Sequence, residues 1–292
     1  MPLQKTRGVE KRLFVVGCSR SGTTVLQVSI ASHPRIQSFP ETGFFVNVLG
    51  DKRKKLARLG LSTGREKKAF ARLLDELERP DWTGRVPRRP WLFNTSAQVF
   101  VQLLDEVTME AGKDIWLEKT PMHVLHTDLM QHYVPDAHFI HIIRDGRDVV
   151  ASLYDRAKKH PGRFRGNFSD PVNGVKRWNE SLKASLGHLD DPAHSFVLYE
   201  QFVASPGSVM QRICRDVGIE YDPCMAQGSS QTADEVVPEE RTWITKAKER
   251  PAPQPSKFDR LFSESERHQI AEQLDLEKYR KVERATAAGE GG

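Results

Sequence analysis

A chain of 292 residues with 38% hydrophobic and 28% charged side chains has the composition of a globular protein and can bury one large core. No apolar run approaches the roughly 20 residues that span a bilayer, so we expect no stable membrane insertion. A net charge of +5 is too small for a nucleic-acid-binding protein but is compatible with an anionic small-molecule ligand.

The N-terminus and the cysteines bear on the cellular compartment. Residues 1–11 are polar and lack the apolar core and cleavage site of a signal peptide, which predicts a cytoplasmic location. Cys18, Cys214 and Cys224 are odd in number and have neither disulfide nor metal-ligand spacing, so we expect a reducing compartment and no metal site.

The first elements predict a strand, a loop and a helix, followed by a helical segment. A β-forming apolar run covers 12–17, a helix is expected over 22–32, and a short strand over 36–39. Residues 44–112 are helical and charged in pattern, with amphipathic stretches at 66–78 and 96–110 around a proline-containing loop at 80–90. We interpret 44–112 as a helical insertion.

Regular alternation of strands and helices resumes after this insertion. The strands are expected at 115–117, 137–143 and 195–199, and the helices at 123–133, 147–156, 172–189 and 206–218. This alternation predicts an α/β fold of three layers, a central parallel sheet flanked by helices, in a single domain over 1–292. Residues after 226 are expected to be irregular up to a last helix at 264–276, with a flexible tail at about 285–292.

The loop after the first strand has the pattern of an anion-binding P-loop. It contains two glycines at P-loop spacing between a strand and a helix, which predicts a P-loop-type fold whose backbone N–H groups wrap an anion at the helix N-terminus. Its residues are Gly17, Cys18, Ser19, Arg20, Ser21, Gly22, Thr23 and Thr24. Thr23 stands where a nucleoside-triphosphate-binding loop has its lysine, and Arg20 supplies a guanidinium that suits a tetrahedral oxyanion.

These residues resemble the loop of sulfotransferases that use 3′-phosphoadenosine-5′-phosphosulfate (PAPS). That loop typically reads Arg-Ser-Gly-Thr-Thr, which residues 20–24 match at every position. The motifs are most similar to those of tyrosylprotein sulfotransferases and their bacterial relatives. The resemblance implies an enzyme that moves the sulfuryl group of PAPS to a hydroxyl or amine, releases adenosine 3′,5′-bisphosphate (PAP) and needs no metal.

A second anion site is expected where the strand 137–143 ends. Arg144 follows this strand, Asp145 is suited to cap the next helix, and Asp148 and Ser152 continue a polar stripe along it. In the sulfotransferase family an Arg and a Ser at this spacing hold the 3′-phosphate of PAPS. We therefore expect Arg144 and Ser152 to share one ligand, and Arg20 and Arg144 to hold opposite ends of the nucleotide.

Three further residues are candidates for catalysis. Lys119 ends a strand at the edge where ligands bind in parallel sheets, and the resemblance implies that it stabilises charge on the leaving phosphate. Glu41 matches the Glu that tyrosylprotein sulfotransferases use as general base, although it is equally suited to cap a helix beginning near Gly43. His123 is an alternative base, with a capping or core role as the other interpretation.

The acceptor is not identified by the sequence. A small molecule, carbohydrate, lipid or peptide all fit, and a homodimer is possible. The basic run 52–55 favours either an anionic acceptor or a solvated helix face. Arg241, Trp243 and Lys257 are candidates for a lid over the 3′-phosphate. A P-loop kinase or NTPase and a non-catalytic nucleotide-binding relative are the competing hypotheses; the absent loop lysine argues against the first.

Overall fold

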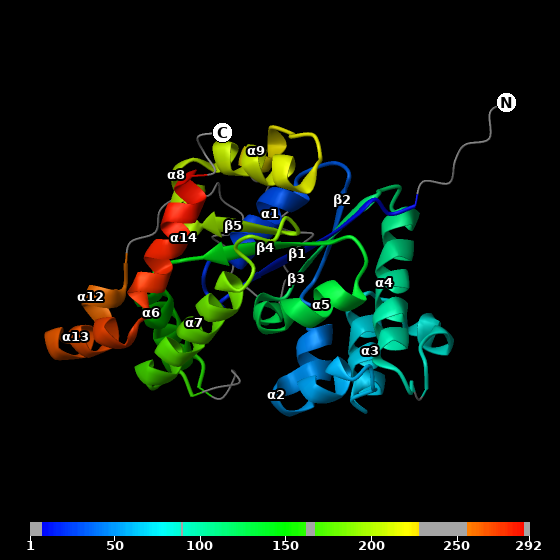
Figure 1. Cartoon of the computed structure of the whole chain (residues 1–292), viewed down its shortest axis with the longest axis horizontal. Coiled ribbons are helices and arrows are strands. Elements are labelled where there is room, and N and C mark those ends of the chain that lie inside the picture. The colour runs from blue at the N-terminus through cyan, green and yellow to red at the C-terminus, as the bar shows by residue number, and fades with distance from the viewer. Residues whose placement is uncertain (1–7, 89, 162–166, 228–255, 289–292) are drawn as a thin grey trace.

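Five parallel strands form the centre of the molecule (Figure 1). The structure is a computed structural model that describes residues 8–88, 90–161, 167–227 and 256–288. The strand order is β2-β3-β1-β4-β5, and every neighbouring pair is parallel. The strands are β1 (Lys11–Gly17), β2 (Ile36–Phe39), β3 (Ile115–Lys119), β4 (Ala137–Ile143) and β5 (His194–Leu198). The predicted α/β fold with a parallel sheet is confirmed.

Helices cover both faces of this sheet, giving three layers (Figure 1). On one face Leu13, Val15 and Ile140 pack with the helices α1 (Thr23–Ala31), α8 (Tyr199–Ala204), α9 (Pro206–Val217) and α10 (Cys224–Gln227). The other face carries Phe14 and Phe139, and its helices are α2 (Phe44–Arg58), α3 (Glu66–Glu76), α4 (Phe93–Glu110), α5 (Thr127–Tyr133) and α7 (Pro171–Leu186). The core therefore lies on both sides of the sheet at β4 and at β1 from Leu13 onward, where the side chains are buried on both faces.

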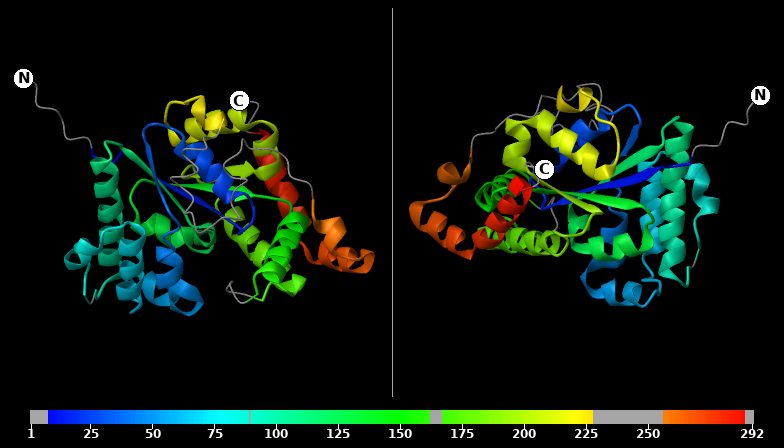
Figure 2. Two further views of the ribbon diagram at one scale, coloured as in Figure 1. Left: turned by 180° about the vertical axis from the view of Figure 1, so that it is seen from behind. Right: turned by 45° about the horizontal axis from the view of Figure 1, so that its top comes forward.

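The segment 44–112 forms helices, as its pattern predicts. α2, α3 and α4 enclose a cluster of aromatic rings in which Phe44 stacks on Phe100 with ring centroids 4.8 Å apart. The stretch expected to be a loop at 80–90 contains a 3-10 helix, η1 (Pro80–Arg85), with the buried Trp82. Figure 2 shows this segment, coloured blue to cyan and green, at the end of the molecule opposite the orange C-terminal helices.

The C-terminal region is more helical than the sequence pattern suggested. Three helices follow residue 255: α12 (Phe258–Leu261), α13 (Glu264–Gln273) and α14 (Leu276–Ala288). The expected last helix at 264–276 corresponds to α13, and α14 was missed. Because α14 continues to Ala288, the expectation of a flexible tail from about 285 is wrong for its first residues; Thr286 is buried there. None of the described helices has both the length and the apolar character needed to cross a membrane.

Four histidines are built into β4, β5 and the turn before β5. His141 lies between Ser185, at 2.9 Å from Nδ1, and His194, at 2.8 Å from Nε2. His188 stacks on His194 with ring centroids 4.0 Å apart, and His138 bonds the hydroxyl of Ser195 at 2.7 Å. Burial lowers the pKa of all four, to about 4 for His138 and about 3 for His194.

These histidines predict acid sensitivity of the fold. Below the ordinary histidine pKa of 6.5 the unfolded chain takes up protons that the folded chain excludes, so stability falls as pH decreases from 6.5 toward the folded-state values. His138 and His194, whose folded-state pKa values are about 4 and 3, each contribute a loss of about 1.4 kcal/mol per pH unit between pH 6.5 and those values. We expect the free energy of unfolding, measured by urea denaturation, to fall steadily from pH 7 to pH 5, where most carboxylates remain ionised. His138→Gln should reduce the change of the unfolding free energy with pH by the contribution of about one proton, or about 1.4 kcal/mol per pH unit. His132→Gln, at an exposed position, is the control and should leave this pH dependence unchanged. The same pH dependence in the two variants would contradict the assignment.

Candidate active site

The loop between β1 and α1 passes unusually close to its neighbours. Gly17 lies against β4, where an added Cβ atom would be 2.4 Å from the carbonyl oxygen of Ile142. Gly22 has a φ of +95°, and an added Cβ would be 2.4 Å from the ring of Tyr199. Both positions require glycine, because a side chain would push the loop off β4 and Tyr199.

The short side chains of this loop point in different directions. Cys18 and Ser21 are buried, and the Ser21 hydroxyl has no hydrogen-bond partner among the described residues. Burial raises the pKa of the Cys18 thiol to about 12, so this thiol stays protonated and is unsuited to act as a nucleophile. Thr23 and Thr24 begin α1, where backbone N–H groups are free to bind an anion, and Ser19 is half-buried beside them.

Arg20 points from the loop toward α6 (Gly146–Lys159). Its backbone adopts a left-handed conformation with φ +77°, which is uncommon for a residue other than glycine. Its Nε donates a hydrogen bond to the Ser152 hydroxyl at 3.1 Å. Arg20 therefore lies on the Ser152 side of the site. The expectation that Arg20 and Arg144 hold opposite ends of the nucleotide stays a prediction, and this hydrogen bond favours the alternative that Arg20 serves the same end as Ser152.

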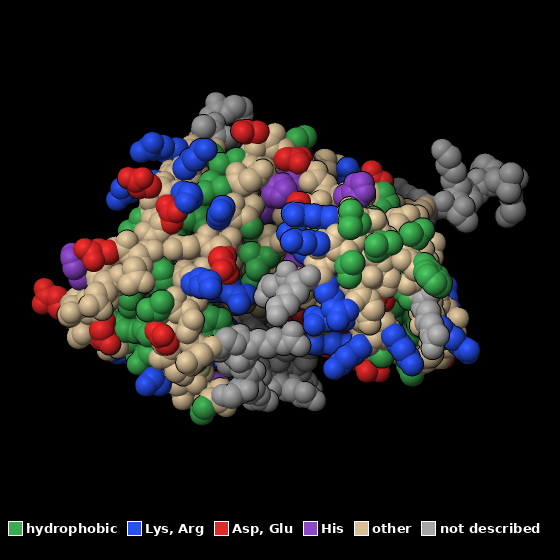
Figure 3. All heavy atoms as spheres, turned by 60° about the horizontal axis from the view of Figure 1, so that its bottom comes forward, with side chains coloured by type: hydrophobic (Ala, Val, Ile, Leu, Met, Phe, Trp, Pro, Cys, Tyr) green, Lys and Arg blue, Asp and Glu red, His purple; other side chains and the backbone are tan. Residues whose placement is uncertain are grey.

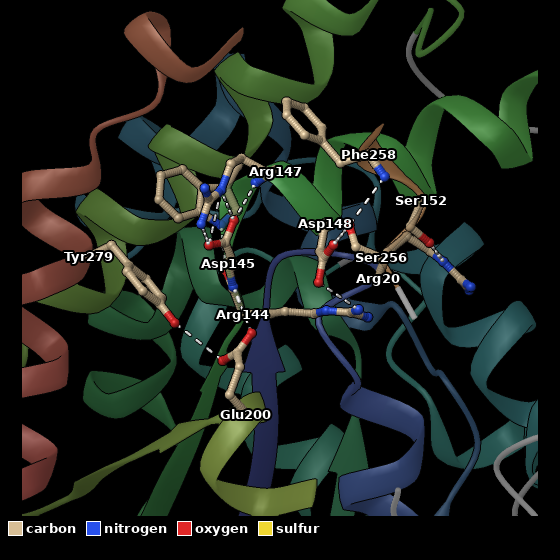
Figure 4. A network of polar contacts seen from close by, with 11 residues as sticks. Arg20, Arg144, Asp145, Arg147, Asp148, Ser152, Glu200, Ser256, Phe258 and Tyr279 are labelled. Atoms are coloured by element: carbon tan, nitrogen blue, oxygen red, sulfur yellow. Dashed lines mark hydrogen bonds and ion pairs between the residues drawn. The ribbon is translucent and has the colours of Figure 1, made fainter. Parts of the chain in front are cut away.

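Arg144 is held in place from several directions (Figure 4). Its guanidinium donates to Asp148 at 3.1 Å and lies 4.3 Å from the centre of the Tyr199 ring. Its backbone carbonyl accepts a hydrogen bond of 2.9 Å from the Trp178 indole. The buried Nε of Arg144 has no partner within the described part of the chain. A fixed arginine with an unused donor is suited to receive an oxyanion.

The two arginines influence each other electrostatically. Desolvation, followed by the positive charge of Arg144, lowers the pKa of Arg20. An arginine remains protonated at neutral pH even with a lowered pKa, so two like charges are held in one region. The Arg20 side chain is exposed to solvent, which weakens this repulsion, so the grouping of Arg20 with Ser152 rests on their hydrogen bond.

Lys119 and Glu41 form an ion pair at the same edge of the sheet. The Lys119 ammonium is almost fully buried and donates to Glu41, whose side chain is 32% exposed. α2 begins at Phe44 with Gly43 as its N-cap residue, and no side chain caps the helix, so the helix-capping interpretation of Glu41 is not supported. The structure thus brings together the candidate base and the candidate leaving-group cation.

A buried carboxylate, Glu118, connects the two chain segments that carry this ion pair. It accepts hydrogen bonds from the N–H of Thr42 at 3.2 Å, from the Thr42 hydroxyl at 2.8 Å and from the Thr120 hydroxyl at 2.5 Å. His123 completes the set at 3.1 Å. Burial opposes ionisation of Glu118, but His123 and the two threonines outweigh it and lower its pKa. Glu118 thereby positions the residues next to Glu41 and Lys119.

His123 is a poor candidate for the general base. It lies within η2 (Pro121–His126) and is fully buried. The centre of its ring lies 6.3 Å from that of Phe14 and 5.6 Å from that of Phe45. A base must reach the proton that it removes, and a side chain without solvent exposure does not meet an acceptor. The core interpretation of His123 fits this position.

The contacts of Tyr199 and Glu200 were not anticipated from the sequence. The Tyr199 ring contacts both Gly22 and Arg144. The Glu200 carboxylate accepts from the backbone N–H of Asp145 at 3.1 Å and from the Tyr279 hydroxyl of α14 at 3.2 Å. The sequence signal that could have indicated these contacts is the Tyr-Glu pair directly after the buried strand β5. In Figure 4, Glu200 lies below Arg144 and faces the hydroxyl of Tyr279.

The C-terminal segment contacts the polar stripe of α6. Asp145 caps α6 by accepting from the N–H of Arg147, as predicted. The Ser256 hydroxyl bonds Asp148 at 2.6 Å, and Lys257 pairs with Asp155 at 2.6 Å. Lys257 thus lies near the expected 3′-phosphate site, whereas the other two lid candidates, at 241 and 243, lie outside the described residues.

One further polar cluster offers metal-binding atoms. Ligand atoms of His188, Asp191 and His194 lie within 4.8 Å of one another. The two imidazole rings are stacked with an interplanar angle of 3°, so their in-plane lone pairs do not converge on one ion. The arrangement does not fit a tetrahedral metal centre.

A parallel sheet with an anion-binding loop, two arginines and a lysine–carboxylate pair at its carboxyl edge defines a P-loop-type transferase of anionic groups. A model of the sulfotransferase family matches residues 12–223 of this chain. The chain belongs to that family, as the resemblance of its loop implied, and is a sulfotransferase. The kinase and NTPase hypothesis is therefore set aside.

The curated relatives that match this chain are named as sulfotransferases. A putative protein-tyrosine sulfotransferase of Caenorhabditis briggsae is 24% identical over 218 residues, which cover 74% of this chain and 68% of the relative. Protein-tyrosine sulfotransferase 1 of Danio rerio is 25% identical over 214 residues, covering 72% of this chain and 54% of the relative. The chain spans about half the length of the zebrafish protein.

Solved structures share the fold. The sulfotransferase domain of the Synechococcus PCC 7002 olefin synthase has a TM-score of 0.59 at 19% identity, with 93% of this chain and 96% of that domain covered. Mouse sulfotransferase SULT7A1 complexed with PAP has a TM-score of 0.54 at 12% identity, with 97% and 89% covered. The similarity extends over nearly the whole chain.

The Glu118 cluster yields a test of positioning. Glu118→Gln replaces an acceptor of four hydrogen bonds by a group that also donates, so we expect the free energy of unfolding to fall by about 1–3 kcal/mol. Turnover should also fall at temperatures where the variant is fully folded, because the segments carrying Glu41 and Lys119 lose their common anchor. Glu180→Gln, at an exposed position of α7, is the control and should change neither quantity. A Glu118→Gln enzyme with normal stability and turnover would contradict the positioning role.

Proposed function

We propose that this chain transfers the sulfuryl group of PAPS to a hydroxyl group of a peptide acceptor, with tyrosine as the first candidate. The contact between Lys119 and Glu41, beside the two arginines, is the observation that carries the proposal. The names of the curated relatives support the choice of a peptide. Small-molecule, carbohydrate and lipid acceptors are the alternatives.

The nucleotide is proposed to bind along the carboxyl edge of the sheet. The backbone N–H groups of residues 18–24 receive the 5′-phosphate end, as in other loops at a helix N-terminus. Arg144 and Ser152 bind the 3′-phosphate, and Arg20 strengthens that site through its hydrogen bond to Ser152. Two guanidinium groups match the double negative charge of a phosphate monoester.

The transfer step needs one base and one cation. The acceptor oxygen attacks sulfur, the bond between sulfur and the 5′-phosphate oxygen breaks, and PAP leaves. Glu41 takes the proton of the acceptor hydroxyl, and the Lys119 ammonium stabilises the negative charge that develops on the departing phosphate.

The compartment is part of the same proposal. All three cysteines are free thiols, two of them buried and Cys224 exposed. Free thiols are compatible with the reducing cytoplasm expected from the sequence.

Nucleotide binding is tested with Arg144. Arg144→Lys keeps the charge but loses the planar fork and its contact with Tyr199, so we expect PAP affinity to fall at least about tenfold, or about 1.4 kcal/mol. Isothermal titration calorimetry measures the loss. Arg147→Lys on the exposed side of α6 is the control and should stay within about twofold of the unmodified chain. Failure of the folded, unmodified chain to bind PAP would refute the proposal.

Catalysis is tested with Glu41 and Lys119. Glu41→Gln and Lys119→Met should each lower the turnover of labelled PAPS with a tyrosine-containing peptide by about 100-fold or more. PAP affinity should persist in Glu41→Gln, because that carboxylate acts on the acceptor. Lys183→Met, on the exposed face of α7, is the control. Normal turnover in both variants would show that these residues are misassigned, and PAP binding by the unmodified chain without transfer to any acceptor class would favour the non-catalytic alternative.

A further inference from the structure

The helical segment 44–112 exposes a cluster of large apolar side chains. Its members are Leu56 (38% exposed), Leu59 (74%), Leu61 (45%), Trp91 (88%) and Leu92 (54%). They form one surface because the chain segments 56–62 and 91–93 are hydrogen-bonded to each other. Leu61 and Leu92 form a β-bridge, and the N–H of Ser62 bonds the carbonyl of Trp91 at 3.0 Å. We call this surface the Trp91 patch.

The exposure of Trp91 differs from that of the other tryptophans in the described chain. Trp82, Trp116 and Trp178 are at most 8% exposed, whereas Trp91 is 88% exposed. A tryptophan and several leucines in contact with water are unfavourable by the apolar area that they leave hydrated. Such a patch indicates a surface that binds another protein or a membrane.

The charge of the chain segment that carries Leu56, Leu59 and Leu61 indicates which kind of surface covers the patch. Residues 51–72 contain nine Lys or Arg and two Asp or Glu, a net charge of +7, whereas the whole chain carries +5. The rest of the chain, with 35 basic and 37 acidic side chains, is therefore slightly negative. The positive charge of this protein is concentrated in the segment that bears most of the Trp91 patch.

Several of these cations are available for a partner. Lys55, Lys67 and Lys68 are exposed, and Arg58 remains 57% exposed although it pairs with Asp128. Glu66, one of the two acidic residues, is buried and bonds Thr63. In Figure 3, apolar side chains gather on the right-hand part of the visible face with Lys and Arg side chains along their border.

We infer that the Trp91 patch and its surrounding cations dock the protein on the surface of an anionic lipid membrane. Leucine and tryptophan side chains enter the headgroup region, where the amphipathic indole is favoured, and lysines and arginines contact the lipid phosphates. A second copy of this chain fits less well, because two segments with a charge of +7 would repel each other. The docking is peripheral and is independent of the proposed transfer reaction.

Vesicle co-sedimentation tests the inference with the full chain. We expect binding to phosphatidylcholine vesicles that contain about 30% phosphatidylserine, weaker binding in high salt, and little binding to pure phosphatidylcholine. The emission of Trp91 should shift to shorter wavelength on binding, and Trp91→Phe should bind while losing most of that shift. Absence of binding to the anionic vesicles at low salt would overturn the inference.

Paired variants separate the apolar and the charged contributions. Leu59→Ser with Trp91→Ser should abolish most of the binding, whereas Met109→Ser with Val172→Ser, at exposed apolar positions outside the patch, should not. Lys67→Glu with Lys68→Glu should weaken binding at least about 25-fold, since each cation near the surface contributes about fivefold. Arg280→Glu with Lys281→Glu makes the same charge change on α14 and is the control. If a test variant and its control variant lost vesicle binding equally, membrane docking would be overturned. It would also be overturned if sedimentation velocity detected a dimer of the unmodified chain that Leu59→Ser with Trp91→Ser dissociates. PAP affinity should be normal in all four variants.

Discussion

The site depends on one close contact, the approach of the loop glycine Gly22 to the ring of Tyr199. The same ring lies 4.3 Å from the guanidinium of Arg144, so a single side chain of α8 fixes the spacing between the anion-binding loop and the second anion site. Any side chain at position 22 would separate them. The five parallel strands make this possible, because their carboxyl ends bring residues 17, 119, 143 and 198 to one edge of the sheet.

The fold could be predicted wherever an element has a strong local pattern. The strands β2 and β4 have the predicted bounds: β4 is a buried run rich in apolar residues, and the four residues of β2 lie between Pro34 and Pro40, which limit the strand. α14 was missed although Leu276, Tyr279 and Val282 recur at helical spacing and the last two are buried. Its many charges and its Ala-Gly ending obscured that pattern.

The site was predictable as a set of residues and not as a set of contacts. Loop spacing and strand ends identified Arg20, Lys119 and Arg144, because those signals are local. The hydrogen bond from Arg20 to Ser152 joins positions 132 apart in the sequence, and the ion pair of Lys119 joins positions 78 apart. Such contacts depend on how strands are ordered in the sheet, which local spacing does not encode. For the same reason the role of Glu118 in anchoring two segments was not foreseen.

The hydrogen bond between Glu200 and Tyr279 has a consequence for biosynthesis. It ties the start of α6 to a helix near the end of the chain, so the anion site draws on residues from position 17 to position 279. During translation the sheet can assemble before α14 leaves the ribosome, while the support beneath Arg144 is still incomplete. A nascent chain would therefore acquire its fold earlier than its full affinity for the nucleotide.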